Sequence, residues 1–232
     1  MLIAVLSDIH ANLEALRAAL DIAEARGADH LVSLGDVVGY GPSASECLDI
    51  VRSDFTLSVL GNHDEAVVTG DTAALPRDGQ AAAALHREQL SEDQRGWLAG
   101  LPLTAERFGA TFAHAAPDEP SAWPRLETFR DTQRQFGAFD TPLCFVGHSH
   151  KPAVVSSSLG VFRVREGHRF LVNVGSVGQP RDHDPRLSFG LYDPEAFTVE
   201  TVRAHYDLAR TATRITEVGL PASLADRLRK GA

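Results

Sequence analysis

The sequence predicts an α/β fold in which short buried strands alternate with helices. Short apolar runs bounded by glycine or polar residues recur along the chain, and segments with helical hydrophobic spacing lie between them. The composition, with 44% hydrophobic and 23% charged residues among 232, is typical of a globular protein with a sizeable core. Because no linker rich in proline, glycine or serine divides the sequence, we expect a single domain over residues 1–232.

Five apolar runs predict strands that each end at polar residues. In chain order they cover residues 2–6, 31–34, 57–60, 110–113 and 143–146. Short continuous apolar runs of this kind are typical of strands that are buried on both faces. Two later runs, at 170–172 and 187–192, also have strand character.

Helical patterns lie between these strands. Leucine and alanine recur at helical spacing from residue 13 to residue 23, and Asn12 precedes them as an N-cap. The alanine-rich segment 80–85 favours a helix over a linker. Residues 91–94, with the sequence Ser-Glu-Asp-Gln, form a capping-box pattern that predicts the start of another helix.

Polar side chains that can bind metal follow each of the five predicted strands. They are Asp8 and His10, then Asp36, then Asn62, His63 and Asp64, then His114, and finally His148 and His150. In α/β sheets ligands gather beyond the carboxyl ends of the strands, so we expect these side chains to meet at one edge. Imidazole, carboxylate and amide groups together suit divalent Mn, Fe, Zn or Ni.

The number of these side chains favours two metal ions, because one tetrahedral ion takes only four ligands. Two ions need a bridging carboxylate, which would hold them roughly 3.5–4 Å apart. Asp36 is the natural bridge, since it stands alone between the pair before it and the group after it. A mononuclear oxygenase site with two histidines and one carboxylate would leave four side chains unexplained. Taken alone, segment 61–64 is also typical of a strand-ending turn.

Other histidines and the cysteines have no such pattern. We expect His30, His86, His168 and His205 to be ordinary structural residues, because none of them follows a predicted strand. Two cysteines, Cys47 and Cys144, cannot form a disulfide framework. Cys144 lies inside an apolar run, where we expect a buried and inert thiol.

Charge and hydropathy restrict the partners of this chain. A formal net charge of −9 repels the phosphate backbone of DNA or RNA, so we expect no stable nucleic-acid partner. A small anionic substrate remains possible where metal ions reverse the local field. The chain starts directly with a strand-like run, and no apolar stretch approaches the ~20 residues of a membrane span. We therefore expect a cytoplasmic protein without a membrane partner, and the sequence is compatible with a homo-oligomer.

The motifs at the strand ends together resemble the calcineurin-like metallophosphoesterases. The family pattern is D-x-H, G-D, G-N-H-D or G-N-H-E, H, and G-H-x-H. This sequence has Asp8-Ile9-His10, Gly35-Asp36, Gly61-Asn62-His63-Asp64, His114 and Gly147-His148-Ser149-His150 in the same order. Segments 7–12, 38–42 and 173–182 further resemble a compact prokaryotic phosphodiesterase branch, and the resemblance extends from residue 2 to about residue 206.

This resemblance implies a fold and a ligand set. The fold is a four-layer α/β/β/α sandwich of two mixed β-sheets flanked by helices, with the runs 170–172 and 187–192 in the second sheet. One metal ion would take Asp8, His10, Asp36 and His150, and the other would take Asp36, Asn62, His114 and His148. His63 stays off the metals and contacts the substrate phosphate or protonates the leaving group, while Asp64 orients it.

The resemblance also implies the reaction. A hydroxide that bridges two divalent ions would hydrolyse a phosphodiester bond of a small substrate, for which a nucleotide is one candidate. A phosphomonoesterase or nucleotidase of the same fold is the alternative, and a non-catalytic binding or scaffolding relative would lack ligands or the histidine that this chain retains. Arg181 follows a glycine-rich loop and is either a contact to phosphate or base, or a surface residue. Tyr40 favours packing, and segments 66–90 and 117–140 should shape the pocket.

Overall fold

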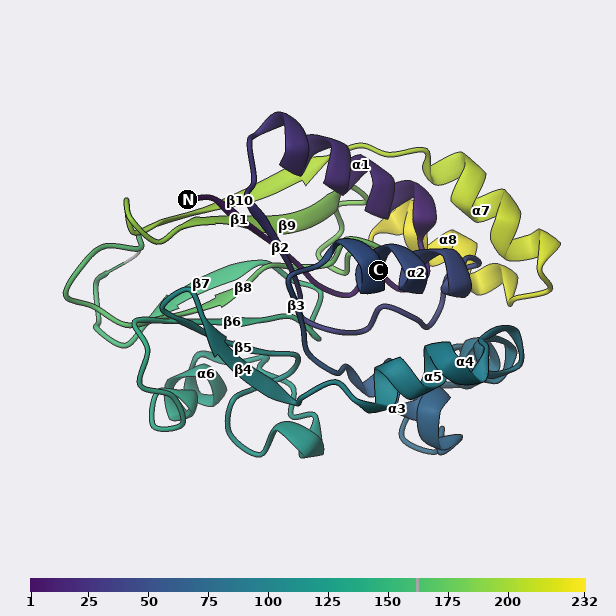
Figure 1. Ribbon diagram of the computed structural model, residues 1–232, viewed down its shortest axis with the longest axis horizontal. Helices are drawn as coiled ribbons and strands as arrows, with labels where there is room; N and C mark the ends of the chain where they lie inside the picture. Colours follow the sequence, from purple (N-terminus) through teal and green to yellow (C-terminus); the bar gives the residue numbers. More distant parts are fainter. Residues whose placement is uncertain (162) are drawn as a thin grey trace.

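Two five-stranded mixed sheets form the centre of the computed structural model, which describes residues 1–161 and 163–232 (Figure 1). The first sheet has the order β10-β9-β1-β2-β3, with β1 (Ile3–Leu6), β2 (His30–Ser33), β3 (Leu57–Ser58), β9 (Leu187–Asp193) and β10 (Thr198–Ala204). The second has the order β4-β5-β6-β8-β7, with β4 (Thr104–Arg107), β5 (Ala110–Ala113), β6 (Leu143–Val146), β7 (Ala153–Ser156) and β8 (Phe170–Asn173). In the first sheet β1, β2 and β3 are parallel to one another, and in the second sheet β5, β6 and β8 are parallel to one another.

The two sheets pack face to face through alternating side chains. Ile3 and Val5 of β1 point into the core between the sheets, whereas Ala4 and Leu6 point to the helices outside. This alternation follows from the two-residue period of a strand. From the second sheet, Phe112 and Phe145 enter the shared core with their ring centroids 5.5 Å apart, and β8 adds further apolar side chains.

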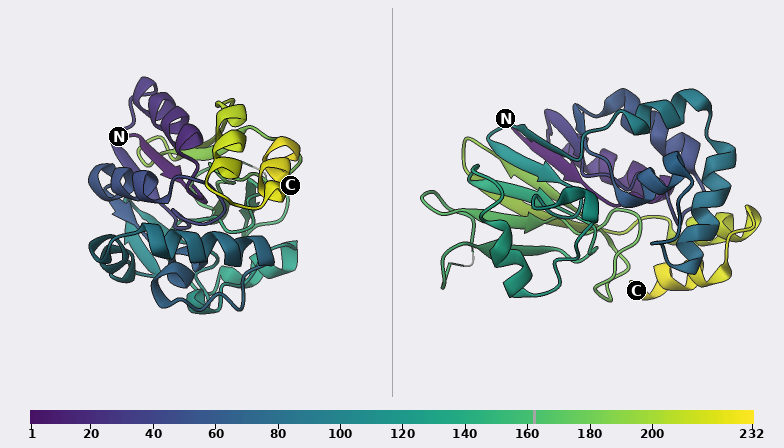
Figure 2. Two further views of the ribbon diagram at one scale, coloured as in Figure 1. Left: turned by 90° about the vertical axis from the view of Figure 1, so that its right-hand side faces the viewer. Right: turned by 90° about the horizontal axis from the view of Figure 1, so that it is seen from below.

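Helices cover both outer faces and one end of the sheets. The helix α1 (Leu13–Ala25) and the helix α2 (Ala44–Asp54) pack on the first sheet, and the short α6 (Phe129–Gln135) lies in the segment that covers the second. The remaining helices are α3 (Asn62–Thr69), α4 (Arg77–Gln89), α5 (Glu92–Ala99), α7 (Leu208–Glu217) and α8 (Ala222–Lys230), with a 3₁₀ turn at Pro120–Ala122. Figures 1 and 2 show that α4, α5, α7 and α8 gather beyond one end of the strands, toward which β1 runs. The predicted α/β/β/α arrangement is confirmed.

Most predicted elements form, with one wrong sheet assignment. The strands expected at 2–6, 31–34, 57–60, 110–113 and 143–146 correspond to β1, β2, β3, β5 and β6, although β3 has only two residues. The run 187–192 was expected in the second sheet, but as β9 it pairs antiparallel with β1 in the first. It forms a hairpin with β10, and the free edge of β1 accepts this hairpin.

The helix starts that were predicted from local capping patterns are confirmed. The side chain of Asn12 accepts a hydrogen bond from the backbone N–H of Ala15, so Asn12 caps α1. Ser91 and Gln94 exchange both bonds of the predicted capping box at α5. The alanine-rich segment 80–85 lies within α4. Cys47 and Cys144 are buried free thiols, and burial raises the pKa of both. Among the described residues, no helix has the length and apolar character needed to cross a membrane.

Candidate metal centre

The candidate ligands come from the strand ends of both sheets, not from one edge of a single sheet as the sequence predicts. Asp8 and His10 follow β1, Asp36 follows β2, and Asn62 begins α3 directly after β3. His114 follows β5, and the pair His148 and His150 follows β6 in the second sheet. Because the two sheets pack face to face, their carboxyl ends lie together, and all seven predicted ligands meet there.

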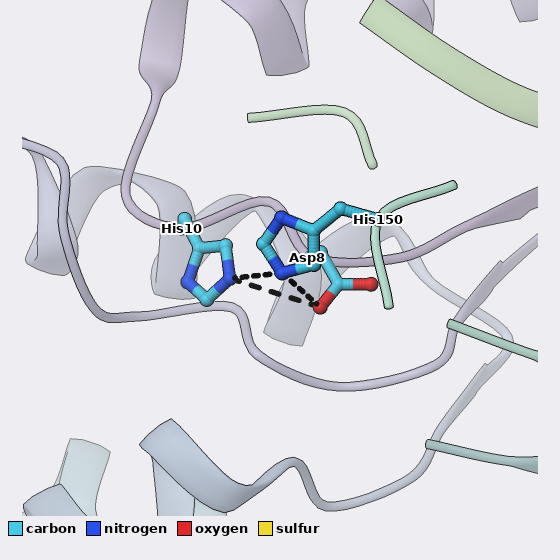
Figure 3. Close-up of side chains that lie close together, drawn as sticks. All are labelled: Asp8, His10 and His150. Carbon is cyan, nitrogen blue, oxygen red and sulfur yellow. Dashed lines mark hydrogen bonds and ion pairs between the residues drawn. The ribbon is translucent and has the colours of Figure 1, made fainter. Parts of the chain in front are cut away.

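The first group consists of Asp8, His10 and His150 (Figure 3). Nε2 of His150 lies 3.1 Å from Oδ1 of Asp8 and 3.2 Å from Nε2 of His10. Nε2 of His10 lies 3.7 Å from the same Asp8 oxygen. All three side chains are buried. Their metal-binding atoms converge on one point, although His10 and His150 are 140 positions apart in the sequence.

The second group consists of Asp36, His114 and His148. Nε2 of His114 lies 3.3 Å from Oδ2 of Asp36 and 3.2 Å from Nδ1 of His148. The amide oxygen of Asn62 lies 3.2 Å from the same His114 nitrogen, which adds a neutral oxygen to this group.

Asp36 lies between the two groups. Its Oδ2 is 3.3 Å from Nε2 of His114 and 3.6 Å from Nε2 of His10, so one oxygen faces both groups. Its Oδ1 accepts a hydrogen bond of 2.8 Å from the backbone N–H of His63, in the first turn of α3. A Cβ atom at Gly61 would overlap the backbone nitrogen and the carboxylate of Asp36, so glycine allows this close approach. Asp36 is therefore close to the donor atoms of both groups.

Hydrogen bonds fix which nitrogen three of the ligand histidines turn inward. Nδ1 of His10, His114 and His150 faces the carbonyl oxygens of Val38 (3.0 Å), Leu34 (2.8 Å) and Gln179, respectively. A carbonyl only accepts, so each Nδ1 donates its proton and Nε2 keeps a free lone pair for metal. Oδ2 of Asp8 accepts from Ser7 and from the backbone of His148, whereas its buried Oδ1 has no partner among the described residues. These donors fit two divalent ions, which would bind in the two groups.

Charge and burial determine the pKa values in the centre. Burial opposes ionisation of Asp8 and Asp36, but the neighbouring histidines hold the pKa of both carboxyls well below its usual range. Burial lowers the pKa of His148 to about 3, with a further contribution from His114. Burial also acts against protonation of His114, but the Asp36 carboxylate outweighs it and raises the pKa of His114 to about 9. A bound cation would take the place of that proton.

The backbone is strained at most of the ligands. Positive φ angles occur at Asp8 (52°), His10 (47°), Asp36 (51°), His148 (61°) and His150 (60°). Residues other than glycine rarely adopt this backbone conformation. Each such residue destabilises the fold by on the order of 1 kcal/mol or more. These sharp turns allow two side chains that follow one strand to point toward the same site. In an extended backbone, neighbouring side chains point to opposite sides.

His63 lies beside the two groups and belongs to neither. Its buried ring is 5.0 Å from the ring of His10 and 4.5 Å from the ring of Tyr40, measured between centroids. Burial lowers the pKa of His63 to about 4; the Asp36 charge acts against this shift and the Arg181 charge adds to it. Its Nδ1 has no hydrogen-bond partner among the described residues.

Asp64 does not bind His63, in contrast to the expected role. Its carboxylate accepts backbone N–H bonds of 3.1 Å from Val38 and 3.1 Å from Gly61. As the third residue of α3, Asp64 points back to the helix start, as in a capping box. Burial and the Asp36 charge raise the pKa of Asp64 to about 7. Asp64 thus holds the loop after β2 and the start of α3.

The metal cleft, a cavity of about 470 Å³ next to the ligands, is lined in part by Asn62, His63, His148 and His150. The predicted pocket segments 66–90 and 117–140 both contribute side chains to its walls. Tyr40 is almost fully buried and packs between His10 and His63, as its predicted packing role requires. Arg181 is half-buried at the cleft, which favours the predicted substrate contact over a surface position.

Two cleft residues carry no sequence signal of their own. Trp123 and Arg125 line the metal cleft from the loop before α6. The indole N–H of Trp123 donates to Oε2 of Glu65 at 2.8 Å, and the indole ring lies 5.7 Å from the ring of His114. The only sequence indication for either residue is that both lie in segment 117–140, which was predicted to shape the pocket.

His86 is a structural histidine, as expected, but it supports the site. It is fully buried; its Nδ1 accepts from the backbone N–H of Gly39 at 3.0 Å, and its Nε2 donates to the carbonyl of Gly41 at 2.9 Å. The clamped loop packs against His63, because a Cβ atom at Gly39 would lie 2.6 Å from Nδ1 of His63. The other three histidines expected to be structural lie outside both ligand groups.

Comparison with known proteins gives consistent results. The calcineurin-like phosphoesterase superfamily domain matches residues 1–196. An uncharacterized protein of Methanocaldococcus jannaschii is 36% identical over 240 residues, which cover 98% of this chain and 97% of that protein. The crystal structure of a metallophosphoesterase from Sphaerobacter thermophilus aligns with a TM-score of 0.89 and 36% identity, over 100% of this chain and 99% of that chain. A hypothetical protein from Pyrococcus horikoshii shares the fold, with a TM-score of 0.78, 21% identity, and coverage of 100% and 98%. The chain therefore belongs to the calcineurin-like phosphoesterase superfamily.

Proposed function

We propose that this chain is a metal-dependent phosphodiesterase that hydrolyses small phosphate diesters, with two divalent cations in its centre. The observation that carries this proposal is the pair of ligand groups that share Asp36 beside the metal cleft, next to a histidine that binds neither group. Family membership supports phosphoester hydrolysis as the reaction class.

The residues that would hold the cations follow from the two groups. Asp8, His10, Asp36 and His150 would hold one, and Asp36, Asn62, His114 and His148 would hold the other. When bound, two such cations lower the pKa of a water and neutralise charge on the phosphoryl oxygens. The mixed imidazole and carboxylate donors suit Mn, Fe, Zn or Ni, and Mn²⁺ is the first ion to test.

His63 would assist the leaving group. In the free chain its imidazole is neutral at pH 7, because its pKa is about 4. The negative charge of a bound phosphate ester would raise that pKa and favour a proton on the ring. A positioned acid of this kind typically contributes 10²–10⁴-fold to the rate. The backbone N–H of His63 donates to Asp36, which ties the start of α3 to the metal groups.

A phosphomonoesterase is the second candidate, and one observation favours it. Arg125 and Arg181 both line the cleft, and such cations would attract the extra charge of a monoester dianion. Room for two alcohol arms favours a diester, because a second cleft adjoins the metal cleft at these two arginines. The two substrates therefore have to be compared directly.

The deciding experiment measures kcat/KM for bis(p-nitrophenyl) phosphate and p-nitrophenyl phosphate with the same metal and at the same pH. A higher value for the diester supports the proposal. A clear advantage for the monoester replaces it by the second candidate. Absence of turnover with Mn²⁺, Zn²⁺, Fe²⁺ and Ni²⁺, in protein that elemental analysis finds loaded, would contradict both and indicate a binding relative.

A further inference from the structure

A second cleft of about 550 Å³ adjoins the metal cleft, and it has no part in holding the metals. Arg125 and Arg181 line both cavities, so the two clefts adjoin at these residues. The floor of the second cleft contains the apolar side chains of Val146, Val155 and Leu171, which belong to β6, β7 and β8. A ligand at the metals can therefore extend over the second sheet.

The loop after β6 separates the two clefts and serves both. His148 and His150 line the metal cleft, whereas Ser149 and Lys151, which alternate with them, line the second cleft. Asn173 of β8 fixes this loop by donating to the carbonyl of Gly147 at 2.7 Å and to the hydroxyl of Ser149 at 3.0 Å. The position of the second cleft relative to the metals is thus set by the same residues that place two ligands.

The second cleft is locally basic on an acidic protein. Three cations, Arg125, Arg181 and Lys151, line it together with one acidic side chain, Glu127, and the terminal residue Ala232, so cations outnumber anions there although the chain has a formal net charge of −9. The buried Nε of Arg181 has no partner among the described residues, while its Nη2 donates to Gln179. The Gln179 bond holds the guanidinium in place where it lines the cleft, and fixed guanidinium groups are strong anion donors.

We propose that the second cleft binds one ester arm of the substrate, and that this arm combines an apolar or aromatic body with a negative charge of its own. The inference rests on the proposed phosphodiesterase function and specifies its substrate class. The apolar floor fits a flat or apolar body, and the three cations fit an anionic group beyond the scissile phosphate. A nucleotide arm with an additional phosphate has this chemistry, and a neutral arm would leave the cations unused.

Two matched substrates test this inference in the metal-loaded enzyme. Thymidine 5′-(p-nitrophenyl phosphate) has a neutral nucleoside arm, and its 3′-phosphorylated derivative differs only by the added anionic group. We expect kcat/KM to be about tenfold higher for the derivative, since two exposed ion pairs together contribute on that order. A ratio of one or less, with both substrates hydrolysed, overturns the inference and leaves the phosphodiesterase function intact.

Substitutions locate the effect. Lys151→Ala should reduce the ratio of the two kcat/KM values to about threefold, and Lys151→Ala combined with Arg125→Ala should bring it near one. Lys230→Ala is the matched control, because Lys230 is the other lysine of the sequence, is exposed, and lies outside both clefts. Arg130→Ala serves the same purpose for Arg125. An equal fall in the controls would assign the preference to general surface charge and overturn the inference.

A binding measurement keeps the test independent of turnover. In protein freed of metal by chelation, the carboxylates of the metal centre repel phosphate, and a dependence of anion binding on Lys151, which lines only the second cleft, reports binding in that cleft. Calorimetry should detect thymidine 3′,5′-bisphosphate but not thymidine, with about threefold weaker binding in Lys151→Ala and no change in Lys230→Ala. Failure of the bisphosphate to bind would overturn the inference. If it binds but no ester is hydrolysed, only the proposed function fails.

Discussion

The buried imidazole of His86 should make the stability of this protein depend on pH between about 6.5 and 4. Burial lowers the pKa of His86 from its ordinary value of 6.5 to about 4, and the hydrogen bond that it donates to Gly41 opposes this shift only in part. In the folded chain Nδ1 accepts the Gly39 N–H, so a second proton on the ring would break that bond. The folded state therefore binds fewer protons than the unfolded state in this range.

The sign and the size of this change in stability follow from the linkage between proton binding and folding. A depressed histidine pKa contributes stability that is present above pH 6.5 and is lost as the pH falls toward 4. Each pH unit between the two pKa values is equivalent to about 1.4 kcal/mol. At pH 5 the loss from His86 is therefore about 2 kcal/mol, which for a chain of this size corresponds to about 4 to 8 °C in Tm.

The assay compares His86→Gln with the parent protein in the presence of a chelator. Glutamine offers an acceptor oxygen and a donor nitrogen with spacing similar to that of the two imidazole nitrogens, so it can keep both backbone bonds without titrating. Thermal unfolding at pH 7.5 and pH 5 gives the fall in Tm for each protein. We expect the fall to be smaller in His86→Gln by about 4 to 8 °C.

A matched control separates this effect from general acid sensitivity. His205 is exposed, so His205→Gln should leave the fall in Tm between the two pH values unchanged. Protonation of the metal-centre residues is common to all three proteins and cancels in the comparison. If Tm falls by the same amount in His86→Gln and in the parent, His86 titrates normally in the folded chain. The two hydrogen bonds between its ring and the backbone of Gly39 and Gly41 would then be wrong.

The remaining predictions concern the site. Asp36→Asn should lose metal from both groups because one oxygen faces both, and elemental analysis after Mn²⁺ loading that still finds two ions per chain would refute the bridging role. His63→Ala should keep the metals but lose about 10²-fold in kcat, less with a nitrophenolate leaving group; loss of metal would instead make His63 a ligand. His86→Ala should lower kcat at pH 8, and His86→Gln should restore it; equal kcat in both variants would remove the loop from catalysis. Chelation of saturating metal should lower the free energy of unfolding by about 4 kcal/mol at 1,000 times Kd, and an unchanged Tm would argue against metal binding to the folded state.

The ligands were predictable because each one follows an apolar run. A strand that ends in Asp, Asn or His places that side chain at a sheet edge, and this inference needs only local sequence. It holds for Asp36 and His114 even though they belong to different sheets. The N-cap at Asn12 was equally local, since the bond spans three residues.

What sequence reasoning missed depends on contacts between distant segments. Trp123 reaches the cleft because Glu65, 58 residues earlier, accepts its indole N–H. His86 supports a loop that precedes it by 45 to 47 residues. Asp64 follows a local rule, the capping box, whereas the family resemblance implied that it orients His63. The strand at 187–192 could pair with either sheet, because its apolar pattern satisfies both cores.

The geometry of the first ligand group indicates why the chain tolerates its strained backbone. His10 and His150 both donate their Nδ1 protons to backbone carbonyls, so neither Nε2 carries a proton, yet these two nitrogens lie 3.2 Å apart. Two lone pairs at that distance repel each other, and the unpartnered Asp8 oxygen beside them adds a negative charge. A cation between the three atoms turns each of these repulsions into an attraction. The positive φ angles at all three residues thus hold an arrangement that a bound metal ion would stabilise, and binding of that ion would offset the backbone strain.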